Sequence, residues 1–143
     1  MISHSAPCHL LILDDSPDDR LLYELALKKI DYKASWQILT TVAEVRAELE
    51  QIASIEKHGP TLFISDLHLQ NGDDPLDIIK WLRAQPHLRR TPTILISGAF
   101  TRQEINTAYE LGVHSLLTKP ASHTQRLAWF QTLLQYWCRH SVS

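Results

Sequence analysis

Five short apolar segments recur along this chain, separated by stretches too long to be hairpin loops. Four of them, at residues 9–13, 62–64, 93–96 and 115–118, are continuous runs in which Leu and Ile dominate. Uninterrupted apolar runs of this length are typical of parallel strands, because helices cover both faces of a parallel sheet. The fifth segment, residues 35–39, is more polar, which predicts a strand at the edge of the sheet.

The stretches between these segments carry helix start signals. Ser16 and Asp74 each precede a proline, so that an N-cap residue is followed by the residue best suited to the first helical position. Thr41 and Thr101 are each followed three residues later by glutamate, which is the capping-box pattern. Gly112 is predicted to end the helix that begins after Thr101.

Alternating strands and helices predict an α/β fold with a parallel sheet, helices on both faces and right-handed crossovers. A length of 143 residues suits one domain. We therefore expect a single domain over residues 1–143, with its core at about 8–138. We expect no output domain after residue 140, and we therefore expect the protein to act by binding or by relay.

Charge is distributed unevenly along the chain, although its net value is only −2. Residues 1–77 hold 14 acidic and 6 basic side chains, whereas residues 78–143 hold 2 acidic and 8 basic ones. This pattern indicates either two solvated faces or an early cation site and a late docking surface. No basic stripe accompanies Arg89 and Arg90, so we expect no nucleic-acid partner. No apolar run is long enough to span a membrane and no secretory signal is evident, so we expect a cytoplasmic protein.

Chemically active residues follow four of the predicted strands. Asp14-Asp15, Asp66, Ser97 and Lys119 stand at the carboxyl ends of these strands, where functional groups gather in open α/β sheets. Each has an ordinary explanation as a turn residue, a cap or an exposed lysine, but their common position favours one site. Clustered carboxylates require a cation, and hard oxygen ligands suit Mg²⁺. A carboxylate nucleophile beside Mg²⁺, a hydroxyl and an ammonium suits phosphoryl transfer.

With these residues in these positions, the sequence resembles the receiver domains of two-component response regulators. The resemblance covers about residues 8–138 and rests on four ordered motifs, Leu-Ile-Leu-Asp-Asp-Ser at 11–16, Ile-Ser-Asp-Leu-His-Leu at 64–69, Ile-Leu-Ile-Ser-Gly at 94–98 and Leu-Thr-Lys-Pro at 117–120. It implies a flavodoxin-like fold with strand order 2-1-3-4-5. Residues 108–113 and the aromatic final helix are similar to the small regulators that partner bacterial phytochromes.

The resemblance also implies a role for each acidic residue of the site. Asp66 is expected to be the phosphoacceptor. Asp15 is expected to bind Mg²⁺ directly and Asp14 to bind it through water. The backbone carbonyl of His68 is expected to complete the protein's share of the metal ligands.

The resemblance implies roles for two further motif residues, and the chain departs from the family pattern at a third. Ser97 is expected to be the switch hydroxyl, and Lys119 is expected to contact the phosphoryl group and to precede a cis Pro120. We expect Lys119 to be exposed, so that its replacement impairs the response more than folding. Leu116 stands where the family usually has an aromatic switch residue, which puts the usual movement of an aromatic ring in doubt.

The implied function is a phosphorylation switch rather than an enzyme, with a histidine kinase or phosphotransfer protein as partner. Two alternatives remain at this stage. A haloacid-dehalogenase-type phosphatase would need an aspartate two residues after the nucleophile, where this chain has His68. A receiver-like protein that binds partners without being phosphorylated is suggested by Leu116 alone.

The final helix, expected over about residues 122–140, carries two apolar stripes. One stripe is predicted to face the core and comprises Leu127, Phe130, Leu134, Trp137 and Cys138. The other lies on an adjoining face and comprises Trp129, Leu133 and Tyr136. Since a surface helix needs only one apolar stripe, the second predicts a homodimer interface, unless a neighbouring loop covers it.

Overall fold

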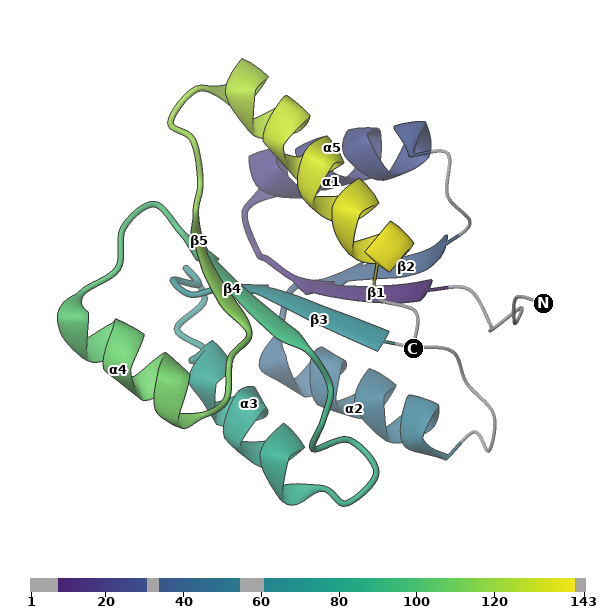
Figure 1. Cartoon of the computed structure of the whole chain (residues 1–143), viewed down its shortest axis with the longest axis vertical. Coiled ribbons are helices and arrows are strands. Elements are labelled where there is room, and N and C mark those ends of the chain that lie inside the picture. The colour runs from purple at the N-terminus through teal and green to yellow at the C-terminus, as the bar shows by residue number, and fades with distance from the viewer. Residues whose placement is uncertain (1–7, 31–33, 55–60, 141–143) are drawn as a thin grey trace.

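The computed structural model describes residues 8–30, 34–54 and 61–140. It contains one parallel sheet in which β2 and β5 form the edges and β3 lies at the centre (Figure 1). The strand order, β2-β1-β3-β4-β5, is the order that the sequence resemblance implies. The strands are β1 (Cys8–Leu13), β2 (Ala34–Leu39), β3 (Thr61–Asp66), β4 (Thr93–Ser97) and β5 (Ser115–Thr118). The predicted α/β fold and the edge position of the more polar strand are confirmed.

In the described part of the chain, five helices cover the two faces of the sheet. Figure 1 shows α1 and α5 on one face and α2, α3 and α4 on the other. Their bounds are α1 (Pro17–Lys29), α2 (Val42–Ala53), α3 (Pro75–Ala84), α4 (Arg102–Glu110) and α5 (His123–His140). Among the described residues, no helix is both long and apolar enough to cross a bilayer.

The helix start signals in the sequence are confirmed. The side chains of Ser16 and Asp74 accept hydrogen bonds from the first turns of α1 and α3, and a proline follows each of them. Thr41 and Thr101 form complete capping boxes at α2 and α4. Gly112 has a φ of +72° just beyond α4, a left-handed conformation that favours glycine at a helix end.

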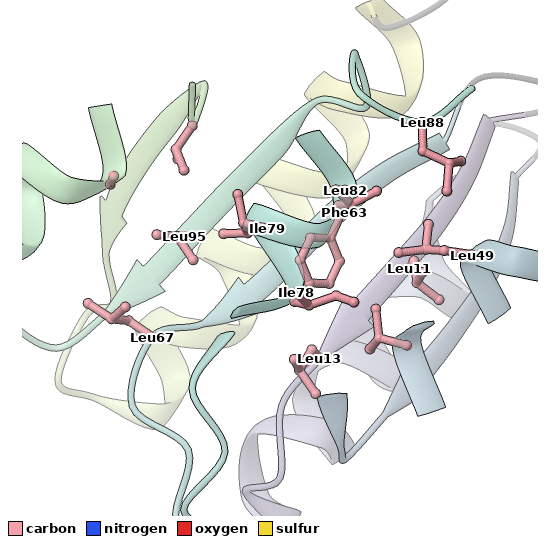
Figure 2. Packing of buried hydrophobic residues seen from close by; sticks show 13 residues of the cluster. Leu11, Leu13, Leu49, Phe63, Leu67, Ile78, Ile79, Leu82, Leu88 and Leu95 are labelled. Atoms are coloured by element: carbon pink, nitrogen blue, oxygen red, sulfur yellow. The ribbon is translucent and has the colours of Figure 1, made fainter. Parts of the chain in front are cut away.

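The strands divide their side chains between two hydrophobic cores. Leu10 and Ile12 of β1 face α1 and α5, whereas Leu11 and Leu13 face the helices on the opposite side. In the second core the ring of Phe63 from β3 lies among apolar side chains of α3, as Figure 2 shows. This two-sided burial explains why the central strands read as continuous apolar runs.

The structure corrects the assignment of stripes on α5. Leu133, predicted to lie on an exposed face, is only 8% exposed and packs into the core together with Phe130 and Leu134. Trp137, predicted to be core, is only partly buried. The error arose because a helix that lies flat on a sheet buries a stripe wide enough to include residues i, i+3 and i+4. The side chain of Cys138, also predicted to be core, lies outside the described part of the chain.

Candidate functional site

Strand register brings the predicted site residues to one edge of the sheet. Leu13 pairs with Ser65, so that Asp14 and Asp66 leave neighbouring strands at the same level. Ser97 at the end of β4 pairs with Thr118, and Lys119 follows immediately. Side chains that are separated by up to 105 residues in the sequence therefore meet at the carboxyl edge of β1, β3, β4 and β5.

The ammonium of Lys119 lies among three carboxylates. Its Nζ is 2.8 Å from Oδ2 of Asp66, 2.6 Å from Oδ2 of Asp19 and 3.5 Å from Oδ2 of Asp14. Burial alone would lower the pKa of Lys119, but the three surrounding carboxylates outweigh it and raise that pKa. The lysine is therefore charged at neutral pH and acts as an internal cation for the acidic cluster.

The expectation of an exposed Lys119 is wrong. The residue is only 8% exposed, and its ammonium points into the buried carboxylates of Asp14, Asp19 and Asp66. The peptide bond before Pro120 is trans, so the predicted cis proline is also wrong. The trans form is the more stable one for most Xaa-Pro bonds, and the Lys-Pro motif by itself does not determine the isomer.

Asp14 is the most deeply buried carboxylate of the cluster. Its side chain is inaccessible to solvent, and its Oδ1 accepts a hydrogen bond of 3.0 Å from the backbone N–H of Ser16. Its Oδ2 has no hydrogen-bond partner, although Lys119 lies nearby at ion-pair distance. Burial raises the pKa of Asp14 from 3.8 to about 6, because desolvation outweighs the attraction of the lysine.

An incompletely satisfied carboxylate in an acidic cluster fits a divalent cation. Single oxygen atoms of Asp14, Asp19 and Asp66 lie within 4.8 Å of one another. Their three negative charges face the Lys119 ammonium and, at Asp19, the Arg126 guanidinium, so a further positive charge would still stabilise the site. These donors are carboxylate oxygens, which Mg²⁺ and Mn²⁺ prefer over softer ligands.

Asp19 was not identified as a site residue from the sequence. It is 3% exposed, and its two oxygens accept hydrogen bonds from Lys119 and, at 2.7 Å, from Arg126 of α5. Burial would raise the pKa of Asp19, but these two cations outweigh it and lower that pKa. Helical spacing in the sequence could have indicated its burial. Asp19 lies four residues before the buried Tyr23 and so shares its face of α1, whereas Asp18 falls on the exposed face. We call Lys119, Asp19 and Arg126 the α5 link.

Asp15 lies beside the cluster without joining it. Its carboxylate accepts a hydrogen bond of 2.8 Å from the backbone N–H of Asn71, in the loop between β3 and α3. The side chain of Asn71 in turn donates to the backbone carbonyl of Thr40 at 2.7 Å. The loop that follows β3 is thereby attached to the loops that follow β1 and β2, and these three loops line one rim of the site.

Ser97 and His68 form a second polar connection, which leads to α4. The hydroxyl of Ser97 donates to the backbone carbonyl of Ala99 at 2.6 Å and lies 2.9 Å from Nδ1 of His68. Nε2 of His68 lies 2.8 Å from the carboxylate of Glu104, in the first turn of α4. The backbone N–H of His68 donates to Oδ1 of Asp66 at 3.0 Å. We call Ser97, His68 and Glu104 the α4 link.

Leu116, which stands at the aromatic position of the motif, is partly buried. It packs against the core on the side of α2, α3 and α4. Leu116 offers no polar group, so the α4 link provides a polar connection between the acidic cluster and α4.

Comparison with known proteins identifies the family. A family model described as the response regulator receiver domain matches residues 10–129. The response regulator Rcp1 of Synechocystis sp. is 25% identical over 132 residues, which cover 92% of this chain and 89% of that protein. The chemotaxis protein CheY1 of Helicobacter pylori is 27% identical over 114 residues, which cover 78% and 84% of the two chains.

Solved structures share the fold at lower sequence identity. A Mn²⁺-bound form of response regulator Rcp1 has a TM-score of 0.80 at 23% identity, covering 96% of this chain and 98% of that one. The phosphorylated cyanobacterial phytochrome response regulator RcpA also has a TM-score of 0.80, at 20% identity and with 97% and 98% coverage. The predicted similarity to regulators that partner phytochromes is therefore confirmed at the level of the fold.

Proposed function

This chain belongs to the response regulator receiver domain family of two-component signalling, and on that premise we propose that Asp66 is its phosphoacceptor. The supporting observation is the position of Asp66 at the carboxyl end of β3, with its carboxylate 2.8 Å from the Lys119 ammonium. The proposed donor is a phosphohistidine on a histidine kinase or phosphotransfer protein. Since such kinases use cytoplasmic ATP, the proposed location is the cytoplasm.

The proposed reaction transfers a phosphoryl group between two side chains. An oxygen of Asp66 forms a bond to phosphorus while the phosphorus–nitrogen bond of the donor breaks, and the imidazole leaves with the electron pair and takes up a proton. The Lys119 ammonium offsets charge on the phosphoryl oxygens, and the Ser97 hydroxyl turns from the Ala99 carbonyl to donate to one of them. The product is an acyl phosphate on Asp66.

Mg²⁺ is the proposed cofactor, held by Asp14, Asp15, Asp66 and the carbonyl of His68. When bound, it would supply positive charge that offsets the negative charge of the phosphoryl oxygens. The unpartnered Oδ2 of Asp14 and the excess of carboxylates over cations support a metal at this position. The inclusion of Asp15 rests on the family motif, since its carboxylate pairs with Asn71 in the structure.

The alternatives are less well supported. Phosphatase chemistry would need a carboxylic acid two residues after Asp66, and the side chain at that position is the imidazole of His68, which faces Ser97 and Glu104. A receiver-like protein that is not phosphorylated would not need a buried lysine among three carboxylates. Such an arrangement is costly to desolvate, which favours a function for it.

Intact mass spectrometry after incubation with acetyl phosphate and Mg²⁺ tests the proposal. We expect one phosphoryl group on the wild-type protein and none on Asp66→Asn. Asp18→Asn, which changes an exposed aspartate in the same region, is the matched control and should be labelled normally. Label on Asp66→Asn, or a wild-type protein that neither accepts label nor responds to beryllofluoride, would contradict the assignment. Turnover of a phosphomonoester would support the phosphatase instead.

A further inference from the structure

Asp19 makes two charged hydrogen bonds that lead in different directions. Oδ2 accepts from the Lys119 ammonium at 2.6 Å, and Oδ1 accepts from the Arg126 guanidinium at 2.7 Å. The carboxylate is 96% buried at its side chain, so solvent barely screens its pairing with Lys119 and screens its pairing with the 22% exposed Arg126 somewhat more. One carboxylate thus connects the proposed phosphotransfer site to α5.

Asp19 is held more firmly than the lysine that it contacts. Its backbone lies in the first turn of α1, where its N–H donates to the Ser16 cap at 3.3 Å. Lys119 has a flexible four-carbon stem and three donors, so its ammonium takes the position that its acceptors define. Asp19 and Asp66 accept from it at 2.6 Å and 2.8 Å, which fixes two of the three donors. The third donor can then meet a phosphoryl oxygen.

Arg126 attaches α5 to both sides of this arrangement. Besides contacting Asp19, it donates through Nε to the backbone carbonyl of Pro120 at 2.8 Å. Pro120 directly follows Lys119, so the guanidinium bridges the turn that carries the lysine and the carboxylate that orients it. A displacement of Lys119 or Asp19 therefore changes the contacts of Arg126 at the start of α5.

A ladder of contacts continues from this pair along α1 and α5. Tyr23 lies one helical turn after Asp19, and Phe130 lies one turn after Arg126. Their rings stack with centroids 4.1 Å apart and an interplanar angle of 18°. Both residues are inaccessible to solvent and belong to the core on this face. Packed interiors transmit displacements because they contain little free volume.

We propose that Asp19 is a positioning residue for phosphoryl transfer, and that its pairing with Arg126 transmits the state of Asp66 to α5. The proposal rests on the proposed function of Asp66. The acyl phosphate adds negative charge next to Lys119 and draws the ammonium towards the phosphoryl group. The hydrogen bond from Lys119 to Asp19 then weakens, and the pairing of Asp19 with Arg126 strengthens. This change in pairing shifts the start of α5 and the stacked rings of Tyr23 and Phe130.

Two variants and a matched control test the positioning role. Asp19→Asn removes the charge at nearly constant volume, and Asp18→Asn makes the same change at an exposed neighbour in the same turn. We expect labelling of Asp66 by acetyl phosphate to slow at least fivefold in Asp19→Asn and to stay within twofold of wild type in Asp18→Asn. If Asp19→Asn does not fold, Asp19→Glu keeps the charge but displaces the lysine, and it should also slow labelling at least fivefold.

Transmission to α5 is measured by NMR of the indole N–H groups of Trp129 and Trp137. Saturating beryllofluoride with Mg²⁺ should shift both signals in the wild-type protein, and Arg126→Gln should reduce these shifts at least twofold while signals from the Asp66 loop still respond. A role of Arg126 in folding alone would change the melting temperature and leave the shifts intact.

The outcomes separate this inference from the proposed function. A wild-type protein that accepts neither phosphate nor beryllofluoride would refute the function of Asp66. In that case the NH₃⁺ signal of Lys119 still tests the positioning, because it should be protected in wild type and Asp18→Asn and lost in Asp19→Asn. A wild-type protein that is labelled, together with Asp19→Asn labelled at the same rate or faster, would overturn the inference and leave the function standing.

Discussion

Two polar connections leave the acidic cluster in opposite directions, and they differ in burial. In the α5 link the side chains of Lys119 and Asp19 are 5% and 4% exposed, and that of Arg126 is 22% exposed. The α4 link runs through His68 and Glu104, whose side chains are 54% and 26% exposed. The hydrogen bonds within each of the two links have similar lengths, between 2.6 and 2.9 Å.

Burial makes similar distances energetically different. Charges that are removed from water interact strongly, and loss of one partner leaves the other without hydration. Charges at the surface are screened and hydrated, so breaking them costs little. We therefore expect changes in the α5 link to affect folding and signalling together, whereas the α4 link can rearrange at small cost. Four variants test this comparison.

The largest effect is expected for Lys119→Ala. Loss of the ammonium leaves Asp14 and Asp66 without the cation that faces them, while Asp19 keeps Arg126, so we expect a loss of about 3–5 kcal/mol in the free energy of unfolding without metal. Mg²⁺ should restore part of this loss. Denaturant unfolding with and without Mg²⁺ checks both, with Lys80→Ala on the exposed face of α3 as the control. A loss below about 1 kcal/mol would show that the site tolerates its charges without the lysine.

Asp14→Asn should stabilise the metal-free protein at neutral pH. The folded pKa of about 6 lies above the ordinary value of 3.8, so the folded protein binds more protons between these values. The contribution of Asp14 to stability therefore falls as pH rises from about 4 to 6, by up to about 3 kcal/mol. The difference between variant and wild type should grow over that window and level off above it.

Unfolding curves at several pH values, without divalent metal, measure this difference. Asp18→Asn, which changes an exposed aspartate in the same region, serves as the control. A constant difference between Asp14→Asn and wild type from pH 4 to 7 would contradict the raised pKa. Added Mg²⁺ should stabilise wild type more than Asp14→Asn, because the variant lacks one carboxylate of the cluster.

Glu104→Gln should have a much smaller effect on folding. Glutamine retains the capping-box hydrogen bond at α4 while removing the charge opposite His68. We expect a loss of at most about 0.5 kcal/mol, since His68 is exposed and Glu104 is only partly buried, so that water screens the pair. Glu44→Gln at the equivalent position of α2 is a close control, because Glu44 also completes a capping box but has no histidine partner. A loss above about 2 kcal/mol relative to this control would place the α4 link in the same class as the α5 link.

The smallest effect on folding is expected for Tyr136→Ala. Self-association through α5 stays a prediction, now limited to Tyr136, which is 56% exposed, and the partly buried Trp129. Because aromatic anchors contribute strongly to interfaces, the variant should shift a dimer towards monomer in sedimentation equilibrium. Its melting temperature should stay close to that of wild type. A wild-type protein that is monomeric at tens of micromolar with and without beryllofluoride would refute the interface.

Local patterns in the sequence determined the elements of the fold. Strand type followed from continuous apolar runs, and helix starts followed from caps such as Ser16 and Thr41, because these signals depend only on neighbours along the chain. The meeting of Asp14, Asp66 and Lys119 was also predictable. The carboxyl ends of parallel strands share one edge of a sheet, whatever the loops between them do.

Tertiary packing alone determined which charges are buried and what they pair with. Asp18 and Asp19 are chemically identical neighbours, but only Asp19 faces α5, and its pairing with Arg126 joins positions 107 residues apart. Leu133 lies in the core because of how α5 rests on the sheet, which sequence spacing did not resolve. Burial and pairing depend on the packing of elements that are distant in sequence, so the sequence predicted the location of the site, and only the structure showed how its charges are balanced.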